Sequence, residues 1–107
     1  MESYDKLVRD NIPDIILANG ENPIVEILEK ENLKRELIKK LSEEALEVSK
    51  AQENKEELIK EISDIQEVIA AIIENFDLDP IEIAKVKAER KIERGGFTKG
   101  IFLKSVN

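Results

Sequence analysis

The hydrophobic residues of this chain recur at helical spacing over most of its length. In the segment 55–76, apolar side chains follow one another at intervals of three and four residues: Leu58, Ile62, Ile65, Ile69, Ile72 and Phe76. The segment 31–51 has the same period, through Leu33, Leu37, Leu41, Val48 and Ala51. This spacing places the apolar side chains along one face of a helix and is typical of helical bundles. We therefore predict two long helices, each with a buried face.

Sparse glycine, proline and asparagine residues mark the boundaries of the elements. Asn19-Gly20 and Pro23 indicate a loop, Asp79-Pro80 opens a helix, and Gly95-Gly96 closes one. We predict an all-α chain with helices at about 10–18, 31–51, 55–76 and 80–94, followed by an extended or irregular tail. Its 107 residues are the length of one ordinary domain, so we expect residues 1–107 to form a single domain.

The segment Gln52 to Asn54 interrupts the two long periodic segments and predicts a turn between them. The two helices would then form an antiparallel hairpin. A lone domain of this size buries a limited fraction of its surface, and the chain has only three Phe, one Tyr and no Trp. We therefore expect the hairpin to pair with that of a second copy, forming a four-helix bundle across a dimer.

The composition excludes several classes of chemistry. Without Cys there is no disulfide, thiolate zinc site or cysteine nucleophile, and without His there is no histidine base or histidine metal ligand. Catalysis would have to use carboxylates, Lys, Arg, hydroxyl groups or a bound ion. The first ten residues are charged, and no stretch approaches the ~20 apolar residues that span a bilayer. We expect a cytoplasmic protein without a membrane partner.

An acidic residue interrupts the apolar stripe of the segment 31–51. At about 100° per residue, Glu44 points between Leu37 and Val48, where an apolar side chain is expected. In the following segment, Glu61 and Asp64 line the border of the apolar face. A helix that only packs against its neighbours has no reason to carry Glu44 within its apolar stripe.

The predicted hairpin brings four carboxylates to matching heights. Glu44 and Asp64 each lie ten residues from Asn54, and Glu47 and Glu61 each lie seven residues from it. Acidic residues three apart are common on charged helices, but two pairs matched about one turn favour a site. Carboxylates this close repel one another unless a cation compensates. Oxygen ligands without His or Cys predict Mg²⁺, with Mn²⁺ as a substitute.

The motifs around these carboxylates resemble those of a known family. LSEEALEV (41–48) followed by KEISDIQEV (60–68) resembles the E-x-x-E, then E-x-x-D signature of the MazG-like all-α nucleoside triphosphate pyrophosphohydrolases. Relatives in that family include phosphoribosyl-ATP pyrophosphohydrolase and the dimeric dUTPases. The segments KLVRDNIPDII (6–16) and ERGGFTKG (93–100) are similar to those of a small single-domain subgroup, so the resemblance covers nearly the whole chain.

The resemblance implies an enzyme with a Mg²⁺ site formed by Glu44, Glu47, Glu61 and Asp64. Such enzymes hydrolyse the α–β phosphoanhydride of a nucleoside triphosphate or related nucleotide to the monophosphate and pyrophosphate. It also implies a homodimer or a dimer of dimers. Glu43, next to the first pair, could hold or deprotonate the attacking water, although a solvent-exposed helix residue is the simpler interpretation.

A bound triphosphate also needs cationic contacts. The candidates are Lys6 and Arg9 near the N-terminus, and Lys87, Arg90, Arg94 and Lys99 in the last part of the chain. Basic residues in a last helical turn also stabilise that helix without any ligand, so the later group has a structural alternative.

Two alternatives to a general nucleotide pyrophosphohydrolase stay open. One is phosphoribosyl-ATP pyrophosphohydrolase activity in histidine biosynthesis, and the other is a non-catalytic helical interaction module. Nucleic acid is not an expected partner, because the net charge is −7 and the chain has few aromatic residues for stacking on bases.

Overall fold

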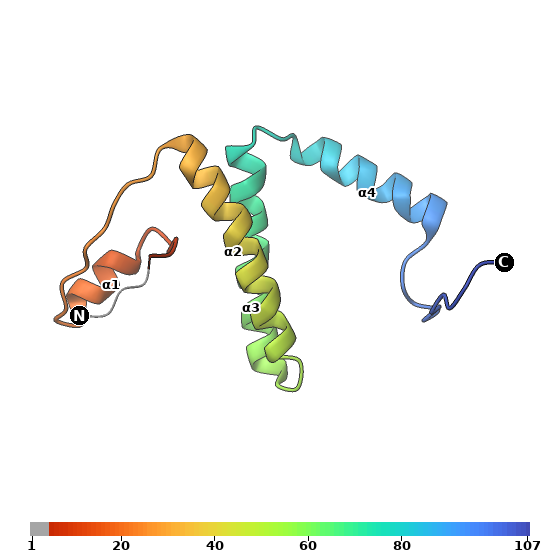
Figure 1. Cartoon of the computed structure of the whole chain (residues 1–107), viewed down its shortest axis with the longest axis horizontal. Helices are drawn as coiled ribbons and strands as arrows, with labels where there is room; N and C mark the ends of the chain where they lie inside the picture. Colours follow the sequence, from red (N-terminus) through yellow and green to blue (C-terminus); the bar gives the residue numbers. More distant parts are fainter. Residues whose placement is uncertain (1–4) are drawn as a thin grey trace. The chain divides into compact units, whose positions relative to one another are not determined.

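The computed structural model describes residues 5–107, and over these residues it contains helices and no strands. The helices are α1 (Ile12–Ala18), α2 (Lys30–Lys50), α3 (Lys55–Asn75) and α4 (Pro80–Arg94), as Figure 1 shows. The predicted all-α class is confirmed, and the predicted helix ends agree with the observed ones to within two residues. Residues 95–107 form no helix or strand, as expected for the tail.

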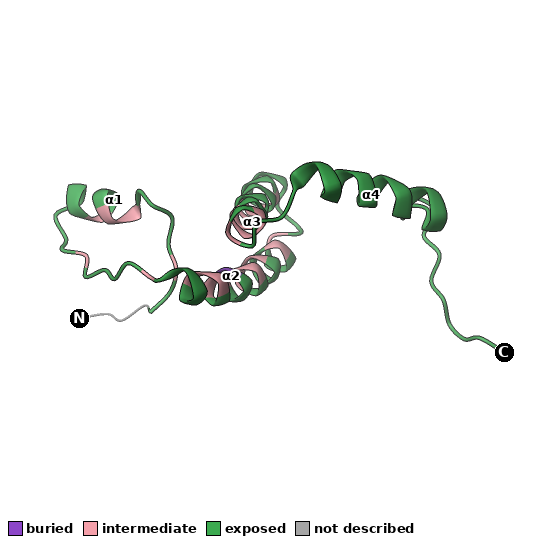
Figure 2. Ribbon diagram, turned by 90° about the horizontal axis from the view of Figure 1, so that it is seen from above, coloured by how far each residue is buried: buried purple, intermediate pink, exposed green. Residues whose placement is uncertain are grey.

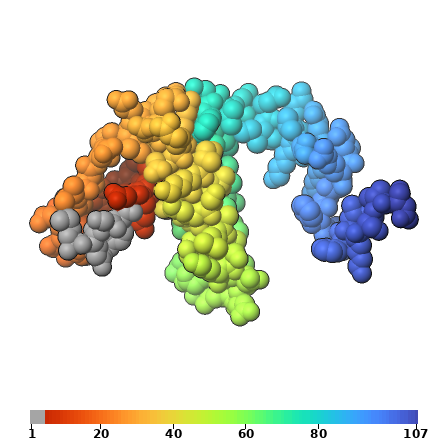
Figure 3. All heavy atoms as spheres, in the orientation of Figure 1, coloured from red at the N-terminus to blue at the C-terminus, as the bar shows by residue number. Residues whose placement is uncertain are grey.

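Helices α2 and α3 form the predicted antiparallel hairpin and pack side by side along their length (Figures 1 and 2). Residues 51–54 connect them, and in Figure 3 this connection forms the tip of the hairpin. The Asn54 side chain accepts a hydrogen bond of 3.1 Å from the backbone N–H of Glu57, which satisfies one free donor at the start of α3. The sharp, capped turn fixes where the two helices begin to face each other.

The core of the hairpin is the line along which α2 and α3 meet. Leu37, with 4% of its surface exposed, is the one fully buried residue among those that the structure describes (Figure 2). Its neighbours along the predicted stripes are half-buried: Leu33, Leu41, Val48, Leu58, Ile65 and Ile72. The helical periodicity thus identified the contacting face of α2 correctly.

One flank of the apolar face of α3 is uncovered. Ile62, Ile69 and Phe76 belong to the predicted stripe of this helix, but all three are exposed. A single partner helix covers only one side of a wide apolar stripe, so α2 partly covers Ile65 and Ile72 and leaves Ile62 and Ile69 exposed.

The chain divides into two compact units, one ending at Phe76 and the other extending from Asp77 to Asn107. The first holds α1, which has Pro13 in its first turn, and the hairpin. The second holds α4, which is capped by the Asp79 side chain and ends at Gly95, whose φ of 81° suits glycine. Among the described residues, no helix combines the length and apolarity needed to cross a membrane.

Candidate metal centre

Three carboxylates meet between the two helices of the hairpin. Glu44 comes from α2, and Glu61 and Asp64 come from α3; one oxygen atom of each lies within 4.8 Å of the other two. All three residues are half-buried. The structure therefore brings together three of the four carboxylates that the matched distances from Asn54 predicted to converge.

Glu44 lies in the apolar stripe of α2, as its helical position predicted. Its side chain is only 13% exposed, and its Oε1 lies 3.7 Å from the Nζ of Lys40, one turn earlier. Lys40 Nζ also lies 3.7 Å from Glu43 Oε2, so one ammonium group is within ion-pair distance of two glutamates. The charge of Glu44 is thus only partly compensated from within its own helix.

The surroundings of Glu61 change the pKa of its carboxylate. Partial removal of its carboxylate from water raises its pKa above the ordinary value of 4.5, and the negative charges of Asp64 and Glu44 raise it further. The Glu61 carboxylate therefore binds a proton more readily than a free glutamate does. A cation placed among these three groups would relieve the same repulsion.

Glu47 lies outside this group of three. Its side chain is 49% exposed, and its Oε1 lies 3.7 Å from Lys50 Nζ. Its charge nevertheless contributes to the raised pKa of Glu61, so the two carboxylates do sense each other across the hairpin. Glu47 as a fourth ligand and Glu43 as a water-holding residue both stay predictions.

Arg9 reaches the carboxylates from the segment before α1. Its Nη1 lies 3.6 Å from Asp64 Oδ1, and its Nη2 lies 3.6 Å from Glu67 Oε1. The sequence predicted Arg9 as a phosphate contact but did not place it beside Asp64. Glu67 was missed, although its position one turn after Asp64 on the same helix could have indicated it.

The other predicted phosphate contacts lie in two places. Lys6 is exposed and belongs to the unit that holds the carboxylates. The later basic residues belong to the second unit, where all are exposed: Lys87, Arg90, Arg94 and Lys99. Their contact with phosphate stays a prediction.

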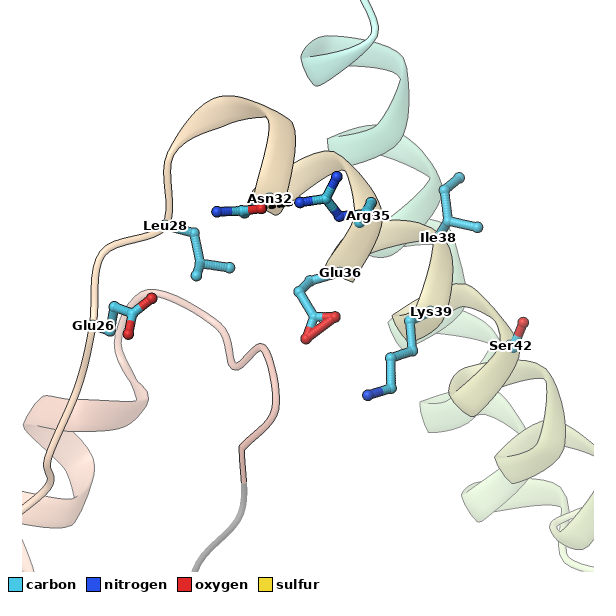
Figure 4. A pocket seen from close by; sticks show the side chains of 8 residues that line it. All are labelled: Glu26, Leu28, Asn32, Arg35, Glu36, Ile38, Lys39 and Ser42. Carbon is cyan, nitrogen blue, oxygen red and sulfur yellow. Dashed lines mark hydrogen bonds between the residues drawn. The ribbon is translucent and has the colours of Figure 1, made fainter.

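A shallow hollow lies between the segment before α2 and the first turns of that helix (Figure 4). Glu26 lines one side, and the oppositely charged Glu36 and Lys39 of α2 line the other. Glu44, Glu61 and Asp64 do not line it. The carboxylate cluster is therefore a separate feature, and the mixed charges of this hollow do not select for an anion.

The cluster fits a hard divalent ion, because it offers carboxylate oxygens from two helices at short mutual distances. Comparison of the chain with protein-family models, curated proteins and solved structures finds no match. A function therefore has to be inferred from the cluster and from the sequence motifs that surround it.

Proposed function

We propose that this chain is a Mg²⁺-dependent, MazG-like nucleotide pyrophosphohydrolase. It would cleave the α–β phosphoanhydride of a nucleoside triphosphate or related nucleotide, giving the monophosphate and pyrophosphate. The observation that carries the proposal is the meeting of Glu44, Glu61 and Asp64 within the hairpin. The resemblance of segments 41–48 and 60–68 to the family signature supports it.

Glu44, Glu61 and Asp64 would hold the ion, with Glu47 as a fourth ligand. A bound Mg²⁺ neutralises phosphate charge and makes a coordinated water more acidic. Mn²⁺ has the same preference for oxygen ligands and would substitute.

The remaining residues would orient the reacting groups. Lys40 Nζ lies 3.7 Å from Glu44 Oε1 and 3.7 Å from Glu43 Oε2, so its charge would help to orient both side chains. Glu43 is the residue available to accept a proton from the attacking water. Arg9 and Lys6 supply positive charge for the phosphates from within the same unit.

We further propose that a second copy of the hairpin covers the uncovered flank of α3, giving a four-helix bundle in a dimer or a dimer of dimers. This flank includes Ile62 and Ile69, whereas the Phe76 ring is partly covered by Lys34 of α2, whose Nζ lies 5.2 Å from the ring centroid. Sedimentation equilibrium should show the dimer or tetramer, and Ile69→Glu should dissociate it. Ile27→Glu is the control, since Ile27 is exposed and lies outside the hairpin. A wild-type monomer would contradict this arrangement.

The decisive experiment is a survey of substrates. Purified protein with Mg²⁺ is incubated with the NTPs, the dNTPs and phosphoribosyl-ATP, and released pyrophosphate is measured. Asp64→Asn and Glu47→Gln should each abolish release without unfolding the protein, whereas Glu74→Gln, an exposed site on α3, should leave it unchanged. Selective turnover of phosphoribosyl-ATP would assign the activity of histidine biosynthesis.

The alternative function is a non-catalytic helical module that binds a partner through apolar side chains. It is favoured by the exposed residues Ile101, Phe102 and Leu103 of the tail. Absence of pyrophosphate release from every substrate, with Mg²⁺ bound, would favour this module over the enzyme.

A further inference from the structure

The guanidinium group of Arg9 lies between two carboxylates with different surroundings. Nη1 faces Asp64, which belongs to the cluster of three, and Nη2 faces Glu67, which does not. Both distances are 3.6 Å. The Arg9 side chain is 58% exposed, so it can change partner without leaving or entering a buried environment.

With an ion in the cluster, Asp64 would have two cationic partners. One is Arg9, already within ion-pair distance, and the other is the divalent ion that the cluster would bind. A divalent ion among three carboxylates lowers the negative potential at Asp64 more than a single guanidinium does. The attraction of Nη1 to Asp64 then weakens, while Glu67, outside the cluster, continues to hold Nη2.

We propose that Arg9 is an exchangeable counter-ion: a divalent ion displaces it from Asp64, and the released N–H groups then bind a phosphate oxygen of the nucleotide, with Glu67 as the anchor. The inference rests on the proposed function and adds an order of events to it. Arginine suits this role because its planar fork keeps one donor pair on a carboxylate while another meets a phosphate.

The first measurement follows the metal alone. Mn²⁺ binding is titrated by electron paramagnetic resonance in the wild-type protein, in Arg9→Gln and in Arg35→Gln. Arg35 is a matched control, because it is an exposed arginine of the hairpin and its Nη2 donates a hydrogen bond to Asn32 Oδ1. Without the competing guanidinium, Arg9→Gln should bind Mn²⁺ about two- to fivefold more tightly, and Arg35→Gln should not.

The second measurement follows a non-hydrolysable nucleoside triphosphate added to the Mn²⁺-loaded proteins. Arg9→Gln should bind this nucleotide about tenfold more weakly or worse, since a charge-assisted contact is lost. With a hydrolysed substrate, the loss should appear mainly as a higher KM. Arg9→Lys keeps the charge but not the fork, so it should bind Mn²⁺ as the wild type does and nucleotide more weakly.

Tighter Mn²⁺ binding together with weaker nucleotide binding in Arg9→Gln distinguishes this exchange from a structural role of Arg9. If Arg9 only ties the N-terminal segment to α3, its loss weakens both ligands together or neither, and either result overturns the inference. Failure of the wild-type protein to bind Mn²⁺ overturns the metal site of the proposed function as well. Wild-type binding that Arg9→Gln leaves unchanged overturns the exchange alone.

Discussion

A carboxylate oxygen of Glu44 on α2 lies within 4.8 Å of one on Glu61 of α3, across the line where the two helices pack. The hairpin thus places a repulsive contact in the same interface as its best-buried residue, Leu37. Packing of the apolar stripes has to offset that repulsion. Negative charges held this close together favour a cation at this position.

Divalent ions should stabilise the folded protein. An ion that binds only the native state raises its free energy of unfolding by about 2.7 kcal/mol at a concentration one hundred times its Kd. We expect Mg²⁺ or Mn²⁺ to raise the melting temperature of the wild-type protein in a thermal unfolding experiment, and EDTA to reverse the change.

The same melting experiment tests which carboxylates hold the ion. Glu44→Gln should remove most of the Mg²⁺-dependent rise, because it deletes one member of the group of three. Glu74→Gln removes an equal charge ten residues beyond Asp64 on α3 and should retain the full rise. An equal rise in both variants would place the ion elsewhere.

The stability of the metal-free protein should depend on the protonation of Glu61. Because its pKa is raised in the folded state, the native protein binds this proton more tightly than the unfolded chain does. The contribution of Glu61 to the free energy of unfolding is therefore fully present below pH 4.5. It is lost as the pH rises from 4.5 through the raised pKa of the folded protein.

Glu61→Gln removes this loss, so the metal-free variant should melt at a higher temperature than the wild type at pH 7. The difference should shrink as the pH is lowered toward 4, where Glu61 itself becomes protonated. Glu56→Gln, at an exposed position in the first turn of α3, should give no such gain, since an acidic residue there favours the helix. A constant difference between Glu61→Gln and wild type at all pH values would contradict the assignment.

Leu37 should contribute more to stability than any other leucine of the hairpin. Leu37→Ala removes a 4% exposed side chain and should lower the free energy of unfolding by about 2–4 kcal/mol in urea denaturation. Leu46→Ala makes the same change at a side chain that is 55% exposed and should cost less than about 1 kcal/mol. Equal losses would mean that another copy of the chain buries Leu46.

The contribution of the Asn54 cap to the free energy of unfolding should be measurable separately. Asn54→Ala removes the acceptor for the backbone N–H of Glu57 and should cost about 1 kcal/mol of stability. Asn54→Asp keeps an acceptor at the same position and should retain most of this stability. Urea denaturation of the two variants makes the comparison, and equal loss in both would show that the side-chain oxygen is not what matters.

The bounds of α3 and α4 were predictable because local interactions of single residues set them. Asn54 and Asp79 cap α3 and α4, and Gly95 ends α4 with a positive φ. What the periodicity could not show is how much of each stripe a partner covers. Ile62 and Ile69 have the same spacing as Ile65 and Ile72, yet only the latter pair is shielded by α2.

The candidate site was predictable where it depends on the hairpin alone. Distances along the sequence from Asn54 brought Glu44, Glu61 and Asp64 together, because both helices are regular. They did not distinguish Glu47, whose side chain turns toward Lys50 on its own helix. The contact of Arg9 with Asp64 was beyond such reasoning, since the path of the segment before α1 follows no helical period.

The fixed turn at residues 51–54 restricts how the length of this chain can change. One residue inserted between Asn54 and Glu61 would rotate Glu61 and Asp64 by about 100° around α3 and carry them away from Glu44. Insertions of about seven residues, two helical turns, in both helices at once would restore the facing arrangement. Related chains should therefore vary in length before α2 and after α3, while the segment from Glu44 to Asp64 either keeps its length or changes by about two helical turns in both helices together.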